Sequence, residues 1–204
     1  MFFRKDFTKA VDNSKYPVRL YTFTGIIEEN LEYILNLVST LEDPAVKYKN
    51  EDNSLKLAKL KADIKNDIAG YLPDEIIKII TFMTVMESVY NSMNEIKEYI
   101  KELVKYPPVG FDLSEIAIKI SGIAKKAIDG FFSGNWAPEL ENEIFEAESA
   151  LNVALRRLNK LNGRKNLEKG RIVYYAGIVM TAKGIIKEGS VQNSASAGNF
   201  SVLV

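Results

Sequence analysis

Hydrophobic residues recur along most of this chain at helical spacing, in two successive sets that cover residues 26–106 and 113–188. Within each set, three segments carry apolar residues every three or four positions, which is the pattern of helices buried on one face. A period of about 80 residues is too long for a solenoid array. The pattern therefore predicts an all-α protein in which two tandem three-helix repeats form one elongated bundle. The expected helices cover about 26–43, 54–72, 74–106, 113–132, 138–161 and 167–188.

The two ends of the chain lack this pattern. Residues 1–25 are rich in aromatic and β-prone side chains and contain Pro17, which predicts an extended N-terminal arm rather than a helix. The arm either packs over the bundle or docks a partner or a second subunit. Residues 189–204 are mostly small and polar and predict a flexible tail. Its apolar end, 200–204, is either incidental or a short plug that docks as a strand or onto a groove.

Small and bulky residues suggest how the helices pack. Trp136 lies in the turn between two expected helices, where it would seal one end of the core. Gly170, Gly177 and Gly184 recur every seventh residue and so lie near one face of the last helix. Such a row permits close helix–helix approach and predicts a tight seam rather than a ligand site. Together with the aromatic arm and a net charge of zero, it favours a homodimer.

Composition excludes several kinds of chemistry. Lysine and arginine total 27, as do aspartate and glutamate, so the basic excess typical of nucleic-acid binding is missing and no nucleic-acid partner is expected. The sequence has no cysteine and no histidine, which rules out thiolate nucleophiles, serine–histidine–aspartate triads and the usual zinc sites. Any metal must be held by oxygen ligands, which suit Mg²⁺, Ca²⁺ or Mn²⁺. No GxSxG or HExxH motif occurs, and neither an enzymatic activity nor a cofactor is expected.

The sequence also predicts a cytoplasmic protein without membrane insertion. Arg4, Lys5 and Asp6 interrupt the N-terminal apolar residues before a signal-peptide core could form. The longest apolar stretch, 172–182, is well short of the roughly 20 residues that cross a bilayer.

One stretch resembles a known family. The sequence LKADIKNDIAGYLPDEIIKIITFMTVMESVYNSMNEIKEYIKEL is similar to the PhoU proteins, in which an acidic second helix leads through a short loop into a third helix with polar residues every fourth position. Here Glu87, Asn91, Glu95 and Ile96 occupy those places. The resemblance implies a bundle of two three-helix repeats that regulates phosphate uptake or phosphate signalling.

The same resemblance implies a degenerate metal motif. PhoU proteins hold iron or other metals in multinuclear clusters on their acidic stripes, but this chain has Asn91 in place of an aspartate. At the matching positions of the second repeat, Ala176, Met180 and Gly184 carry no side-chain oxygen. Two interpretations of the acids stay open: a buried Glu87 satisfied by a tyrosine, asparagine or lysine of a neighbouring helix, or a vestigial cation site. The candidate ligands are Glu87, Asn91, Glu95, Asp63 and Asp67.

Two further charged groups are ordinary features of helix ends. Acids at 139, 143 and 146 and the basic cluster at 156–165 suit the two ends of a helix dipole, although the basic cluster could also bind phosphate or a partner.

The function favoured by the sequence and by the resemblance is a non-enzymatic, PhoU-like regulator that contacts a transporter or a signalling protein. The alternatives are an oxygen-ligand metal-binding bundle and a helical adaptor unrelated to phosphate.

Overall fold

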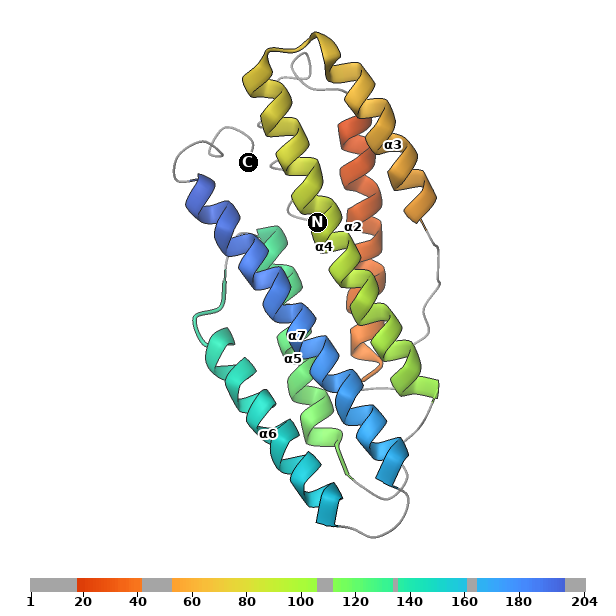
Figure 1. Cartoon of the computed structure of the whole chain (residues 1–204), viewed down its shortest axis with the longest axis vertical. Coiled ribbons are helices and arrows are strands. Elements are labelled where there is room, and N and C mark those ends of the chain that lie inside the picture. The colour runs from red at the N-terminus through yellow and green to blue at the C-terminus, as the bar shows by residue number, and fades with distance from the viewer. Residues whose placement is uncertain (1–17, 42–52, 106–111, 134–135, 161–164, 197–204) are drawn as a thin grey trace.

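The fold is an all-α bundle, as the hydrophobic pattern predicts. The computed structural model describes residues 18–41, 53–105, 112–133, 136–160 and 165–196, and these ranges contain helices but no strand (Figure 1). The elements are α2 (Val18–Ser39), α3 (Ser54–Asp67), the 3-10 helix η1 (Ile68–Gly70), α4 (Pro73–Lys105), α5 (Ser114–Ser133), α6 (Leu140–Lys160) and α7 (Lys165–Ser196).

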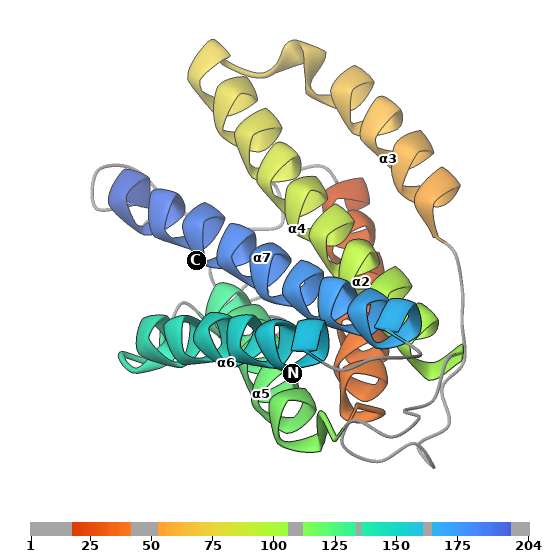
Figure 2. The ribbon, with the colours of Figure 1, turned by 60° about the horizontal axis from the view of Figure 1, so that its bottom comes forward.

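Two long helices, α4 and α7, form the centre of the bundle. They run antiparallel and pack extensively against each other (Figures 1 and 2). α2 supports α4 in one half of the molecule, and α5 supports α7 in the other. α3 and α6 lie at the outside, next to α2 and α5 respectively (Figure 2). Because α4 and α7 join the halves, one hydrophobic core runs through the whole bundle.

α4 shows how the sequence builds this core. Pro73 occupies the first helical position, where its missing N–H costs nothing, and Asp74 and Glu75 complement the positive end of the helix dipole. Its inward stripe follows helical spacing and is almost completely shielded from solvent; the buried apolar members are Ile79, Phe82, Met83, Met86, Val89, Tyr90, Met93, Ile96, Ile100 and Leu103. The helix reaches Lys105, where the described stretch ends, and the expected end at about 106 lies just outside the described residues.

The two halves differ in how their outer helices pack. α6 packs against both α5 and α7, so the second half is a closed three-helix unit. α3 packs mainly against α2 and has no comparable contact with α4. The described helices thus fall into two sets of three, but a helix-for-helix duplication stays a prediction.

Both expected boundaries at the ends of the chain are wrong. Residues 18–25, expected in an extended arm, form the first turns of α2 because Leu20, Phe23 and Ile27 share one face and are buried. Their helical spacing outweighs their β-prone neighbours. α7 likewise continues to Ser196, beyond the expected start of the tail at 189. The remainder of the arm, 1–17, and of the tail, 197–204, lies outside the described residues.

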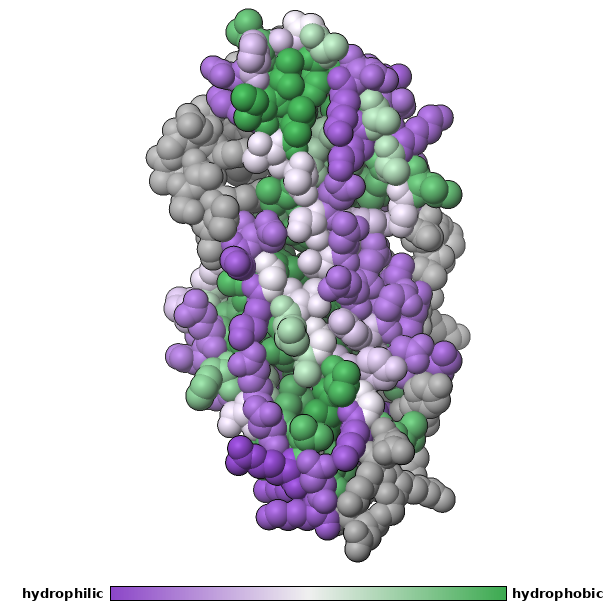
Figure 3. Space-filling model, viewed as in Figure 1, coloured by the Kyte–Doolittle hydropathy of each residue, from purple (hydrophilic) through white to green (hydrophobic). Residues whose placement is uncertain are grey.

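The visible surface is largely polar, with an apolar patch over the first turns of α4 (Figure 3). Among the described helices, none combines the length and apolar character needed to cross a bilayer.

Candidate functional site

The acids proposed as metal ligands point toward different neighbours. Glu87 of α4 is half-buried and forms an ion pair with Lys61 of α3. Asp67 of α3 receives two hydrogen bonds from the Arg19 guanidinium of α2, at 2.7 and 2.8 Å, and Asp63 lies 4.0 Å from the same group. This pairing raises the pKa of Arg19 further above its ordinary value. The ion pairs of Asp63 and Asp67 thus link α3 to α2, whereas the ion pair of Glu87 links α4 to α3.

The rest of the polar row on α4 faces elsewhere. Asn91 is exposed, and the Glu95 carboxylate accepts a hydrogen bond of 3.2 Å from the Thr181 hydroxyl of α7. Within the described ranges, no three acids gather closely enough to suggest a metal site. The structure therefore supplies a structural partner for four of the five candidate ligands, and cation binding by the set stays a prediction.

The glycine row on α7 forms a close contact at one position only. A β-carbon at Gly177 would lie 2.7 Å from the Tyr99 ring of α4, so the missing side chain makes room for that ring. The same ring packs at a tilt against Tyr174, with centroids 6.3 Å apart. β-carbons at Gly170 and Gly184 would meet no atom within 4 Å. At these two positions α7 faces open space, so they form no seam within the chain, and their packing against a second chain stays a prediction.

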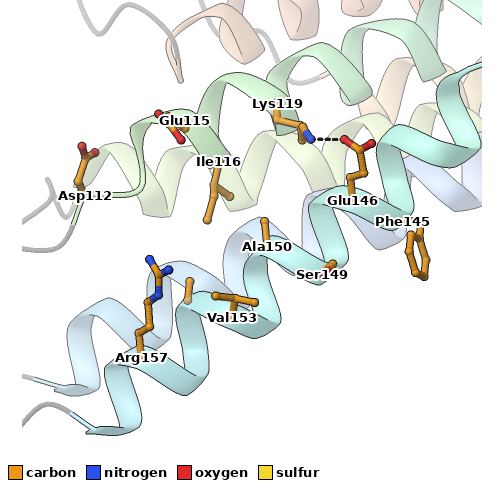
Figure 4. A pocket seen from close by; sticks show the side chains of 11 residues that line it. Asp112, Glu115, Ile116, Lys119, Phe145, Glu146, Ser149, Ala150, Val153 and Arg157 are labelled. Atoms are coloured by element: carbon orange, nitrogen blue, oxygen red, sulfur yellow. Dashed lines mark hydrogen bonds and ion pairs between the residues drawn. The ribbon is translucent and has the colours of Figure 1, made fainter.

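Among the described residues, a groove between α5 and α6 is a candidate for a functional site. It has a volume of about 630 Å³ and opens on the outer surface (Figure 4). Small side chains create it: Ser149, Ala150 and Ala154 of α6 leave a hollow opposite Ile116 of α5. The lining residues are Asp112, Glu115, Ile116, Lys119, Phe145, Glu146, Ser149, Ala150, Val153, Ala154 and Arg157.

Ion pairs close one end of this helix pair and leave the other end open. Lys126 of α5 donates a 2.6 Å hydrogen bond to Glu143 of α6, which raises the pKa of that lysine. Closer to the groove, Lys119 bonds Glu146 across it (Figure 4). Beyond this pair, no ion pair joins α5 to α6 in the part of the chain that is described. The two helices therefore present a hollow rather than a sealed seam at this end.

The open end carries separate charges on its two rims. Asp112 and Glu115 stand on the α5 rim, and Arg157 extends from α6 on the opposite rim (Figure 4). Asp112 accepts hydrogen bonds from the Ser114 N–H at 2.9 Å and from its hydroxyl at 2.6 Å. These bonds stabilise the carboxylate and lower the pKa of Asp112. The aspartate thus stays charged near neutral pH and holds the first turn of α5.

The α6 edge of the groove carries apolar side chains that face solvent, and Phe145 points away from α5 (Figure 4). Phe145 is 72% exposed and Val153 is 43% exposed, and with Ser149 they form a row at four-residue spacing on the outer face of α6. This second apolar stripe, outside the inward-facing stripe of α6, is the signal for the groove in the sequence. The lining joins apolar side chains, one hydroxyl and rim charges, which suits binding of an apolar ligand with charged edges.

Comparison with known protein families, with curated proteins and with solved structures finds no significant match for this chain. The resemblance to PhoU proteins therefore stays an expectation from the sequence.

Proposed function

We propose that this chain is a non-enzymatic binding protein that accepts an amphipathic helix of a partner protein in the groove between α5 and α6. The observation that carries the proposal is the exposed apolar row of Phe145 and Val153 beside a hollow of about 630 Å³. Covering side chains of this size contributes about 1.5–3 kcal/mol each when burial is complete.

The dimensions of the groove favour a helical occupant. Its floor follows α6 from Glu146 to Arg157, about eleven positions that rise about 16 Å. About three turns of a partner helix fit this length. A helix that binds against α5 and α6 would become the fourth helix of the unit formed by α5, α6 and α7. The small residues of the groove would allow this helix to approach closely.

The charges on the two rims indicate which charged residues the partner helix should carry. A partner with lysine or arginine along the edge facing Asp112 and Glu115, and an acid along the edge facing Arg157, complements the open end. Such pairs at a solvent-exposed rim set orientation and association rate more than affinity. The resemblance to PhoU proteins supports a transporter or a signalling component of phosphate uptake as the source of this helix.

A peptide selection tests the proposal and does not require that the partner protein be identified first. Peptides displayed from a random helical library are selected on the full chain, and their affinities are measured by fluorescence anisotropy. We expect selected peptides with apolar residues at three- and four-residue spacing and with basic residues on one edge. Val153→Asp should weaken their binding about tenfold or more, because it places a charge on the apolar floor.

Val173→Asp is the matched control, since Val173 is a 64% exposed valine on α7 that does not line the groove. Circular dichroism checks that both variants stay helical. If the selected peptides bind both variants as they bind the parent chain, or if selection yields no helical binder, the proposed binding groove is wrong.

A further inference from the structure

The first turns of α4 expose an apolar surface at the opposite end of the protein from the open end of the groove (Figures 1 and 3). Leu72 is 69% exposed, Ile77 is 63% exposed and Ile80 is 37% exposed. Lys78 is the only charged residue in the stretch 76–86, IIKIITFMTVM. A helix that is apolar on nearly all sides is normally covered on all sides. One side of this stretch is left uncovered by the described residues. Together with Leu72, which directly precedes α4, we call it the α4 row: Leu72, Ile77, Ile80, Thr81 and Thr84.

The α4 row continues the side of α4 that faces α7. Ile77, Thr81 and Thr84 lie on the same helical face as Ser88, and the Ser88 hydroxyl lies 3.4 Å from the Glu188 carboxylate of α7. Toward the start of α4, the two helices diverge (Figure 2). The apolar surface therefore lies in the wedge that opens where α7 leaves α4.

The described end of α7 lies at this wedge. From the contact at Glu188, α7 runs on to Ser196 and rises about 12 Å. From Ser88 back to Ile80, α4 covers the same number of residues in the same direction, so Ser196 stands about level with Ile80 along the bundle. Residues 197–204, AGNFSVLV, follow directly. Fully extended, they reach about 26 Å, which is more than the height of the remaining row.

The composition of this segment matches the surface. Residues 197–204 contain no charged side chain, and Phe200, Val202, Leu203 and Val204 are large and apolar. Gly198 and Asn199 are residue types that end helices and start turns. The N-terminal segment 1–17 is a poorer match, because it carries charges at positions 4, 5, 6, 9, 12 and 15.

We propose that residues 197–204 dock on the α4 row of the same chain, with Phe200 and the following aliphatic residues against Ile77 and Ile80. In this arrangement the segment covers an apolar surface of α4 that would otherwise be open to other molecules. It acts as an internal ligand of α4, separate from the α5–α6 groove.

The cysteine-free sequence permits a direct test. Thr81→Cys combined with Ser201→Cys places one thiol on the row and one in the segment without removing an apolar side chain. A short bismaleimide reagent is added to the full chain, and products are separated on a denaturing gel and identified by mass spectrometry after digestion. We expect a cross-link within one chain, formed about tenfold faster than in the control pair Ser149→Cys with Ser201→Cys, because docking raises the effective concentration of the two thiols. Ser149 is an exposed serine of the distant groove.

Equal rates in the two pairs would overturn the proposal, as would cross-links that form mainly between two chains, which would identify a second copy as the occupant. A chain that ends at Ser196 provides an independent measurement. Removing the segment should increase the fluorescence of the apolar dye ANS several-fold, and Ile77→Asp in the shortened chain should reverse the increase. If the shortened chain binds no more dye than the full chain, the segment does not cover the row.

Discussion

The indole of Trp136 fills the space that a β-carbon on Gly189 would occupy, so the ring lies directly against the backbone of α7. On its other side, a β-carbon at Gly130 of α5 would lie only 2.6 Å from the same indole. The ring is thus held between two glycines of neighbouring helices. The expectation that Trp136 seals one end of the core agrees with this arrangement, which fixes the end of the α5–α7 pair.

Gly189→Ala should destabilise the protein by about 1–3 kcal/mol, because the added methyl group overlaps the indole and forces it outward. Gly184→Ala is the matched control on the same helix. It should stabilise the protein by about 0.5–1 kcal/mol, since alanine favours helix and nothing lies within 4 Å of its β-carbon. Urea unfolding followed by the fluorescence of the single tryptophan measures both. Equal stability of the two variants would contradict the packing of Trp136 against Gly189.

Glu87→Gln should leave the helical content unchanged and lower the free energy of unfolding by about 0–1 kcal/mol, because it breaks a partly exposed ion pair with Lys61. The loss should shrink at high salt, which screens such pairs. Glu98→Gln is the control, since Glu98 pairs with Lys101 inside α4 and joins no second helix.

Elemental analysis of the same purified proteins tests the metal interpretation. We expect no multinuclear cluster in the parent chain and no metal change on Glu87→Gln. Several iron or manganese atoms per chain, lost in Glu87→Gln, would instead assign the α4 acids to a metal site.

Asp112 should titrate below its ordinary pKa, because two hydrogen bonds from Ser114 stabilise its charged form. A carboxylate with a lowered folded pKa stabilises the fold above its unfolded pKa, and this contribution is lost as pH falls through the folded pKa. Ser114→Ala removes the hydroxyl donor and should move the pKa of Asp112 back toward the ordinary value. NMR titration of the Asp112 carboxyl carbon measures the shift, and Ser149→Ala should leave it unchanged.

The chain is expected to form a homodimer, on the basis of its zero net charge, its aromatic N-terminal arm and the glycine row of α7. Light scattering at micromolar concentrations should then give a mass near twice 23.0 kDa. A monomer mass across the whole concentration range would refute this expectation. The open positions at Gly170 and Gly184 offer α7 no tight seam within the chain.

The interiors of the helices could be predicted from the sequence because burial imposes a regular spacing. α6 is an example: Ile144, Leu151 and Leu158 recur every seventh residue, and all three are buried. The start of α2 could not be placed in the same way. There, aromatic and β-branched residues favour a strand locally, and only contact with the rest of the core favours the helix.

The candidate site depended on geometry that spacing along one helix does not reveal. A lysine was one of the partners expected for Glu87, but its identification as Lys61 requires the angle at which α3 returns beside α4. The α5–α6 groove arises from small residues at the contact of two helices, so it depends on the distance between their axes. In the sequence, Phe145 and Val153 mark the groove as an apolar row outside the inward stripe.

The attachment of α3 has a consequence for how the protein moves. Leu57 and Ile64 are the buried apolar residues of this helix, and the ion pairs of Arg19 and Lys61 link it further to α2 and α4. Little apolar surface is therefore exposed when α3 separates from the bundle, and the free energy of that opening is small compared with global unfolding. We therefore expect α3 to open as a separate local unfolding unit, with amide hydrogens that exchange ahead of those of α4, and rising ionic strength should widen the difference.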